Sequence, residues 1–225
     1  MRALCIFADC VWSVRLILKK FAFSLAEVLV TLTVIGVLAA FTIPTVLQNM
    51  EDAQYKTAAK AAYSKISQAV TNMVKEEGTL SQYIGNNASF KQQFIKYFNV
   101  SKDCNMNDCV PEEDLSNIYK TIGNNPANTN GMGGEGQFVT NDGMFFNIQN
   151  TVSHDGHIII VVDVNGYEKK PNVYGRDTFA FEIYNDKVLP MGASGTRLGE
   201  SSVCNRTATD ALQGLGCTVK AIRGE

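Results

Sequence analysis

The feature that most constrains this chain is an apolar run of 21 residues at positions 23–43. A helix of that length crosses a hydrocarbon core of about 30 Å. No charged residue lies at positions 28–43. Arg15, Lys19 and Lys20 precede the run, and basic residues mark the cytoplasmic end of a membrane span. The sequence therefore predicts a single membrane-spanning helix with a cytoplasmic N-terminus and an exported remainder.

The average composition hides this division. The 225 residues are 45% apolar and 19% charged, as in an ordinary globular protein. That composition excludes a disordered chain and a protein with several membrane spans. The 20 Lys and Arg against 22 Asp and Glu give a net charge of −2, which also excludes a strongly basic nucleic-acid binder. We therefore expect no direct contact with nucleic acid.

An acidic residue, Glu27, lies near the start of the apolar run. An ionised carboxylate at the centre of a bilayer costs about 2.5–3.5 kcal/mol on insertion scales. One interpretation is that Glu27 is shallow enough to reach the lipid headgroups. The other is that its carboxylate has a specific partner. The residues that precede Glu27 favour the second interpretation.

Residues 19–27 have the sequence Lys-Lys-Phe-Ala-Phe-Ser-Leu-Ala-Glu. This segment resembles the cleavage and methylation signal of type IV pilins and of the pseudopilins of type II secretion systems. The resemblance implies that a prepilin peptidase cuts between Ala22 and Phe23 and methylates the new α-amine of Phe23. Lys19 and Lys20 would belong to the processing signal. Ala22 departs from the more usual glycine, which implies slower processing.

Three further positions agree with the assembly helix of this family. Glu27 is the fifth residue after the cut, which is the family's acidic position, and Pro44 lies where many members have a helix-bending proline. Gly36 supplies a second helix-weakening position. After cleavage, the α-amine of Phe23 is a positive charge that can pair with Glu27 of an adjacent subunit. Since an unpaired charge in an apolar bundle is costly, the resemblance implies that Glu27 sets the stagger between subunits, with peptidase recognition as a second role.

Beyond Pro44 the apolar residues recur at a spacing of three and four, with lysines between them. This pattern predicts an amphipathic helix with one covered face. Gly78 is a suitable stop, so one helix can run from residue 23 to about residue 77. The alternative is two helices that break at Pro44. The predicted segments are a leader at 1–22, the apolar half of the helix at 23–50, its amphipathic half at 51–78 and a globular head at 79–225.

The head has 147 residues, enough for one compact domain. Apolar residues at helical spacing predict a short helix at 89–99, and another is expected at 113–122. Alternating and β-branched residues then predict strands, with a hairpin signal at Asn141-Asp142-Gly143. The predicted strands lie at 137–140, 144–149, 157–164, 178–184 and, as a short addition, 187–189. The chain is thus expected to be α+β, with three or four antiparallel strands on the long helix, the pilin-like fold that the resemblance implies.

Six cysteines are present, and Cys5 and Cys10 lie in the predicted leader. The four in the head allow three pairings. The first expectation pairs neighbours in sequence, because the second loop would then resemble the C-terminal disulfide-bounded region of many pilins. An exported, oxidising location agrees with disulfides, whereas a zinc site is the alternative, although the spacing matches no standard finger. The expected pairs are Cys104 with Cys109 and Cys204 with Cys217.

A loop between the two longest predicted strands offers hard oxygen ligands. Asp163, Asn165 and Asp177 lie at turn positions, with the carbonyls of Tyr167 or Asn172 nearby. Calcium prefers such ligands, and some secretion pseudopilins carry calcium in a loop beside their sheet. The glutamate that closes an EF-hand loop is absent. Two interpretations therefore stand: a calcium site, and a structural turn built from Asx and glycine residues.

The remaining motifs point to no catalytic chemistry. Residues 131–136 fit G-x-G-x-x-G, but they neither follow a strand nor open a helix, which disfavours nucleotide binding. His154 and His157 have no evident third metal ligand. The sequence has no nucleophile elbow and no HExxH motif. We therefore expect a protein that is not an enzyme and that requires no cofactor, calcium apart.

The expected function is that of a structural subunit, either a pilin of a type IV pilus or a pseudopilin of a type II secretion system. The resemblance implies an inner-membrane precursor, later extracted into a filament. It also implies the partners: prepilin peptidase, an inner-membrane platform protein, a cytoplasmic assembly ATPase and other pilin-like subunits. One alternative is a membrane-anchored periplasmic binding domain that does not polymerise. Another is a DNA-uptake pseudopilin, which the acidic head, with 12 Lys and Arg against 16 Asp and Glu, disfavours.

Overall fold

The structure is a computed structural model of the chain that describes residues 24–104, 109–130, 132, 136–149, 156–199 and 203–225. The chain divides into two compact units. The first ends at Val46, and the second comprises Leu47–Glu225 and contains the core. The predicted leader at 1–22 lies outside the described residues.

One long helix, α1, runs from Leu25 to Glu77 without interruption. Its 53 residues correspond to about 80 Å at a rise of 1.5 Å per residue. The single-helix prediction is confirmed over this range, and the alternative with two helices is wrong, because Pro44 lies inside the helix. The helix ends as predicted at Gly78, which adopts a left-handed φ of 86° and donates its N–H to the carbonyl of Val74 at 2.9 Å.

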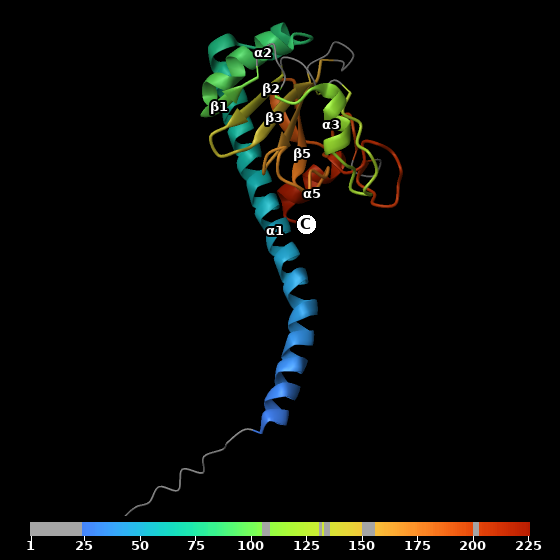
Figure 1. The fold of residues 1–225 in the computed structure, drawn as a ribbon. Coiled ribbons are helices and arrows are strands. Elements are labelled where there is room, and N and C mark those ends of the chain that lie inside the picture. The colour runs from blue at the N-terminus through green and yellow to red at the C-terminus, as the bar shows by residue number, and fades with distance from the viewer. Residues whose placement is uncertain (1–23, 105–108, 131, 133–135, 150–155, 200–202) are drawn as a thin grey trace, which may run out of the picture. The chain divides into compact units, whose positions relative to one another are not determined.

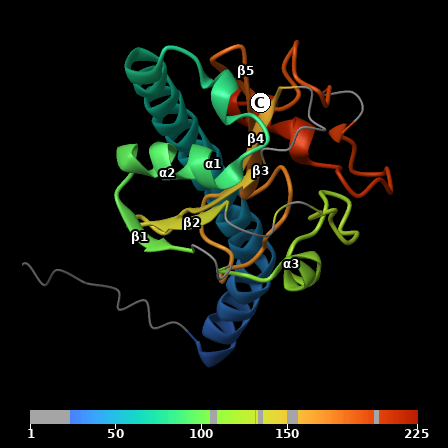
Figure 2. The ribbon, with the colours of Figure 1, turned by 90° about the horizontal axis from the view of Figure 1, so that it is seen from above.

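The amphipathic part of α1 covers one face of the sheet. Small and branched residues recur on the buried side of the helix. In Figures 1 and 2 the strands lie beside this part of α1. The helix residues that are almost completely buried are Ala59, Ala62, Ile66, Ala69, Val70 and Met73.

The sheet is antiparallel throughout, and its strands follow one another in sequence order. Within the described residues it has six strands, so the predicted number of three or four was too low. The strand missed entirely is β1, which is short and polar and has three exposed residues, so it carries no apolar alternation. The strands are β1 (Val100–Asp103), β2 (Gln137–Thr140), β3 (Phe145–Gln149), β4 (Ile158–Asp163), β5 (Thr178–Tyr184) and β6 (Lys187–Pro190).

Successive residues of β4 alternate between two cores. Phe146 of β3 pairs with Val162 of β4, which pairs with Phe179 of β5, and all three belong to the core that includes α1. Ile159 and Val161 of β4 point to the opposite face and join a second, smaller core. Tyr119, Tyr174, Met191 and Leu215 complete that second core from the loops and the C-terminal segment.

Short helices connect these elements. The first predicted helix begins earlier than expected because Asn86 caps it, accepting the N–H of Ser89 at 2.9 Å. The second predicted helix is present but shorter. The helices near the C-terminus were not predicted. The short helices are η1 (Leu80–Tyr83), α2 (Asn87–Phe94), η2 (Ile95–Tyr97), α3 (Glu112–Ile118), η4 (Leu215–Cys217) and α5 (Thr218–Arg223).

Both predicted disulfides are present, Cys104 with Cys109 and Cys204 with Cys217. The Cα atoms of the pairs are 5.2 and 4.9 Å apart. The zinc alternative is therefore wrong for these four cysteines, because their sulfurs are bonded to one another.

Removing the second disulfide with the double change Cys204→Ser and Cys217→Ser is expected to lower the free energy of unfolding by about 3 kcal/mol. Removing the first in the same way should cost about 2 kcal/mol, because a shorter loop restrains the unfolded chain less. The sequence separations are 13 and 5 residues. Urea unfolding of both double variants measures the difference, and an equal or inverted order would contradict it.

Gly214 is expected to be intolerant of any side chain. Its φ is 111°, and a Cβ built there would overlap the carbonyl oxygen of Tyr174. Gly214→Ala should therefore cost at least about 2 kcal/mol more than Gly143→Ala, since overpacking adds to the strain. Gly143 is the matched control, because its φ is also positive, at 85°, but no atom lies within 4 Å of its Cβ position. Similar unfolding free energies for the two variants would contradict this prediction.

Candidate functional site

The N-terminal part of α1 presents apolar side chains without a cover. From Leu25 to Met50 the large apolar residues are 40–80% exposed. The helix is long and apolar enough to cross a membrane. The sequence-predicted positions Gly36 and Pro44 both lie within it, and Gly36 has no neighbouring atom within 4 Å of its Cβ position. This surface suits a lipid environment or a bundle of similar helices.

Four threonines interrupt this apolar surface, but their hydroxyls do not need an outside partner. Each Oγ1 donates to the backbone carbonyl four residues earlier, at distances from 2.7 to 3.3 Å. A hydroxyl satisfied in this way enters a hydrocarbon environment at lower cost than a free one. The threonines are Thr31, Thr33, Thr42 and Thr45.

Glu27 and Ser24 form a reciprocal pair at the start of α1. The N–H of Ser24 donates to Oε2 of Glu27 at 2.8 Å, and the N–H of Glu27 donates to Oγ of Ser24 at 3.2 Å. This is a capping box, which satisfies two backbone donors at the helix N-terminus. Within a single chain, Glu27 therefore has a structural role that the sequence analysis did not identify. The carboxylate stays exposed and keeps further lone pairs for another donor.

The loop between β4 and β5 is organised by buried carboxylates. Asp163 ends β4 and is 1% exposed. Its Oδ2 accepts the hydroxyl of Tyr119 at 2.9 Å, and its Oδ1 accepts the N–H groups of Asn165 and Gly166 at 3.2 and 3.0 Å. Both carboxylate oxygens thus have donors from the chain, and the arrangement around Oδ1 is an Asx turn.

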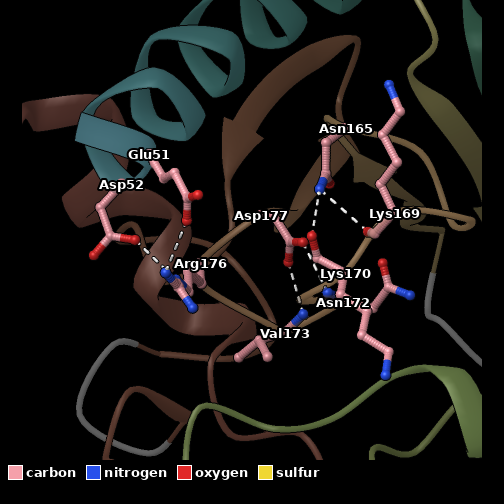
Figure 3. A network of polar contacts seen from close by, with 9 residues as sticks. All are labelled: Glu51, Asp52, Asn165, Lys169, Lys170, Asn172, Val173, Arg176 and Asp177. Atoms are coloured by element: carbon pink, nitrogen blue, oxygen red, sulfur yellow. Dashed lines mark hydrogen bonds and ion pairs between the residues drawn. The ribbon is translucent and has the colours of Figure 1, made fainter. Parts of the chain in front are cut away.

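Asp177 fixes the other end of the loop. It is fully buried, and its two oxygens accept the N–H groups of Val173 at 2.6 Å and Asn172 at 2.8 Å. The amide of Asn165 donates across the loop to the carbonyls of Lys169 and Lys170, both at 3.2 Å. Figure 3 shows these bonds closing the loop from both sides.

Arg176 forms ion pairs between this loop and α1, and the sequence did not predict them. Its Nε lies 2.8 Å from Oδ1 of Asp52, and its Nη2 lies 3.6 Å from Oε2 of Glu51. Figure 3 shows the guanidinium reaching back to the helix beside Asp177. The three side chains are partly exposed, so the pairs contribute at most about 1 kcal/mol each. No sequence motif marks such a contact, because the partners are more than 120 residues apart.

Burial raises the pKa of both loop carboxyls. The pKa of Asp163 rises to about 7, first because of desolvation and then because of the nearby Asp177 charge, while the Tyr119 hydroxyl and two backbone N–H groups act in the opposite direction. Desolvation also raises the pKa of Asp177, against the bonds from Val173 and Asn172. The pKa of Tyr119 is raised well above its usual value by burial and by the Asp163 charge. The network is thus most stable when Asp163 carries a proton.

These contacts fit a structural turn better than a calcium site. Calcium takes six to eight oxygen ligands, yet all four carboxylate oxygens of Asp163 and Asp177 already accept bonds from the chain. The side-chain amide of Asn165 likewise serves the loop backbone. Among the described residues, no group of three or more His, Cys, Asp or Glu side chains could hold a metal ion. Calcium binding stays a prediction, which a calcium titration of the melting temperature tests.

Other sequence-predicted residues lie apart from this loop or outside the description. His157 stacks on Tyr184 with ring centroids 3.9 Å apart, and its Nδ1 pairs with the buried carboxylate of Glu182. His154 and most of the glycine-rich segment at 131–136 lie outside the described residues. The same holds for the predicted processing residues Lys19, Lys20, Ala22 and Phe23.

The chain was also compared with known proteins. No protein-family model, no curated protein and no solved structure matches it. What the chain does therefore has to be inferred from its own residues.

Proposed function

We propose that this chain is the structural subunit of a filament, a pilin of a type IV pilus or a pseudopilin of a type II secretion system. Two features support the proposal together. Residues 19–27 resemble the prepilin processing signal, and the helix that follows begins at Leu25, as such a subunit requires. The α+β head, with an antiparallel sheet packed on the second part of α1, agrees with a pilin-like fold.

The main observation behind the proposal is that the apolar side chains of α1 change from exposed to buried along the helix. The large apolar side chains are exposed as far as Met50, while the residues buried against the sheet begin at Ala59. A monomeric soluble domain rarely exposes so large an apolar surface. A bilayer before assembly, and neighbouring helices after it, would cover that surface in turn.

Glu27 is the residue that we assign to assembly. Cleavage before Phe23 would create a positively charged α-amine, and the exposed carboxylate of Glu27 in a neighbouring subunit would pair with it. Two opposite charges in an apolar bundle are far less costly as a pair than alone. The pair would fix the axial stagger of subunits, with Gly36 and Pro44 allowing the helix to adjust locally.

The proposal also assigns location and partners. The basic residues before the span support a precursor in the inner membrane with a cytoplasmic N-terminus and an exported head. Prepilin peptidase would process it, and a platform protein and an assembly ATPase would add it to a filament of similar subunits. The two disulfides are compatible with an oxidising compartment for the head.

A second function deserves a test because of the capping box. Since Ser24 already satisfies Glu27 within one chain, Glu27 is also explained in an anchored periplasmic domain that never polymerises. In that case Glu27 would matter for helix stability alone, and its replacement would leave function intact.

Mass spectrometry of the N-terminus of protein taken from cell membranes tests the proposal. The expected mature chain starts at Phe23 with a methylated α-amine. A chain that keeps residues 1–22, or that starts elsewhere, would overturn the filament assignment. Changing Ala22 to Gly should leave the cut in place and speed it, whereas changing Phe23 to Asp should slow it.

A further inference from the structure

An apolar hollow of about 210 Å³ opens on the face of the sheet that lies away from α1. Its wall includes Ile159 and Val161, whose side chains point to the second core. Met191 and Leu215 line it from the C-terminal segment. Leu198 and Leu212 also line it and are half-buried, so apolar side chains continue from the floor toward solvent. An apolar hollow of this kind offers water few partners.

A few of the described lining residues are polar. Asn130 and Gln149 lie there, and Nε2 of Gln149 donates to the carbonyl of Asn130 at 3.4 Å. Arg197 is the charged residue in the described part of the lining, and it is exposed. Apolar walls with a few placed polar groups are the general character of small-molecule sites.

The backbone that carries Arg197 is held in place by a buried carboxyl group. Oε2 of Glu182, which is fully buried in β5, accepts the N–H of Arg197 at 2.9 Å. The hydroxyl of Thr196 accepts the N–H of Gly192 at 3.1 Å and lies 3.1 Å from the carbonyl oxygen of Leu198. These bonds close the loop on itself, so the backbone at Arg197 is preorganised beside the hollow.

The opposite wall is fixed in a similar way. Tyr174 is fully buried, and its hydroxyl donates to the carbonyl of Asn128 at 3.0 Å and lies 3.2 Å from the sulfur of Met132. The lining of the hollow is therefore fixed at the backbone of Arg197 and at the side chain of Tyr174. A ligand would meet a formed site without first having to order it.

From this arrangement we propose that the hollow binds a small apolar carboxylate. An apolar cavity of about 150 Å³ accommodates benzene, so this hollow holds a benzene-sized group with room for one substituent. The carboxylate would lie on the guanidinium of Arg197, which matches it with two parallel hydrogen bonds. The ligand is either a free acid or the C-terminal residue of a peptide with an apolar side chain. This inference is independent of the filament proposal.

The test uses the full chain in nanodiscs with ¹³C-labelled methyl groups of Ile, Leu and Val. Benzoate is titrated, and the methyl signals of Ile159, Val161 and Leu215 are followed. The expected result is a saturable shift of these signals, with benzyl alcohol, the uncharged match, binding about tenfold more weakly. Absence of saturable shifts with benzoate, and with a peptide that ends in Phe with a free carboxyl group, would overturn the proposal.

Two variants separate the contribution of the carboxylate to binding from that of the apolar contacts. Arg197→Gln keeps the backbone bond to Glu182 and should weaken benzoate about tenfold while leaving benzyl alcohol unchanged. Leu212→Trp should fill the hollow and abolish both titrations. Equal binding of benzoate to the parent chain and to Arg197→Gln would contradict the assigned ligand class. Tighter binding of the peptide than of benzoate would identify a peptide terminus as the source, and its amidated form should then lose the effect.

Discussion

Replacing Glu27 by Gln is expected to abolish filament assembly while the chain stays in the membrane. Gln can keep the capping box with Ser24, since it retains an acceptor oxygen for the Ser24 N–H. It removes the negative charge, however, and would leave the α-amine of a neighbouring Phe23 unpaired in the helix bundle. Breaking such a pair costs about 3–5 kcal/mol, which weakens each subunit contact more than a hundredfold.

Two further variants separate the effect of the Glu27 charge on assembly from the effect of the capping box. Ser24→Ala removes the side-chain half of the capping box, at a cost of about 1 kcal/mol, but leaves the charge of Glu27 in place. We expect this variant to assemble. Glu27→Ala removes both the cap and the charge, and it should fail to assemble to the same extent as Glu27→Gln.

Electron microscopy and quantification of the sheared filament fraction measure assembly, and immunoblots of membranes measure retention. Assembly by Glu27→Gln together with loss in Ser24→Ala would show that the cap matters and the charge does not. That outcome would contradict the charge-pairing role of Glu27, whereas a parent chain that forms no filaments would favour the anchored domain that does not polymerise. Loss of the protein from the membrane in all three variants would instead assign Glu27 a role in insertion, against the assembly role.

Replacing Asp163 by Asn is expected to stabilise the head at neutral and alkaline pH. The folded pKa of Asp163 is raised from 3.8 to about 7, so the folded chain holds this proton more tightly than the unfolded chain does. The resulting stabilisation is complete below about pH 4 and is lost as the pH rises through 7. The loss amounts to about 4 kcal/mol, because each pKa unit corresponds to about 1.4 kcal/mol.

The geometry explains why Asn should fit at this position. One oxygen of its amide can accept the N–H groups of Asn165 and Gly166, as Oδ1 of Asp163 does. Its NH₂ group can donate to the Tyr119 hydroxyl, which then turns its own hydrogen away. Asn therefore resembles the protonated acid, and the decline in stability between pH 4 and pH 7 should disappear.

Urea unfolding from pH 4 to pH 8, in buffers that contain a chelator, measures the effect. Tyr119→Phe is the matched control, because it removes a donor that lowers the pKa of Asp163. In that variant the decline should still begin near pH 4 but extend to higher pH and become larger. A parent chain whose stability relative to Asp163→Asn does not change with pH would contradict the prediction. Repeating the series with calcium tests the alternative site, since an ion bound to the ionised carboxylates would remove the decline at high pH.

Much of α1 and of the central strands could be predicted from spacing alone. The buried positions Ala59, Ile66 and Met73 were recognisable because a helix buries residues at a regular interval. The predicted range for β5 matches the structure, since its aromatic residues alternate. The pairing of neighbouring cysteines is also confirmed.

The elements that escaped prediction are those whose stability comes from distant contacts. β1 is polar and exposed, and it exists because it pairs with β2 across 35 or more residues. The C-terminal helix α5 has only six residues, too few to be stable without the surface on which it packs. Local propensity carries no signal for either element.

The candidate loop shows the same limit at the level of chemistry. Asp163, Asn165 and Asp177 could be identified as oxygen donors at turns, but their partners could not. Tyr119, which donates to Asp163, lies 44 residues before it. This distant donor and the backbone N–H groups of the folded loop occupy the carboxylate oxygens, and they favour a structural turn.

The sequence by itself determined the apolar run, the charge pattern around it and the position of Glu27, because hydrophobicity and charge are properties of the residues wherever the chain places them. It therefore determined that the chain has a helix able to enter a membrane, and it motivated the filament proposal. Only the tertiary structure decided which side chains share a face or a bond, because such contacts join residues that folding alone brings together. The buried pair Tyr119–Asp163 and the hollow beside Arg197 are of this kind.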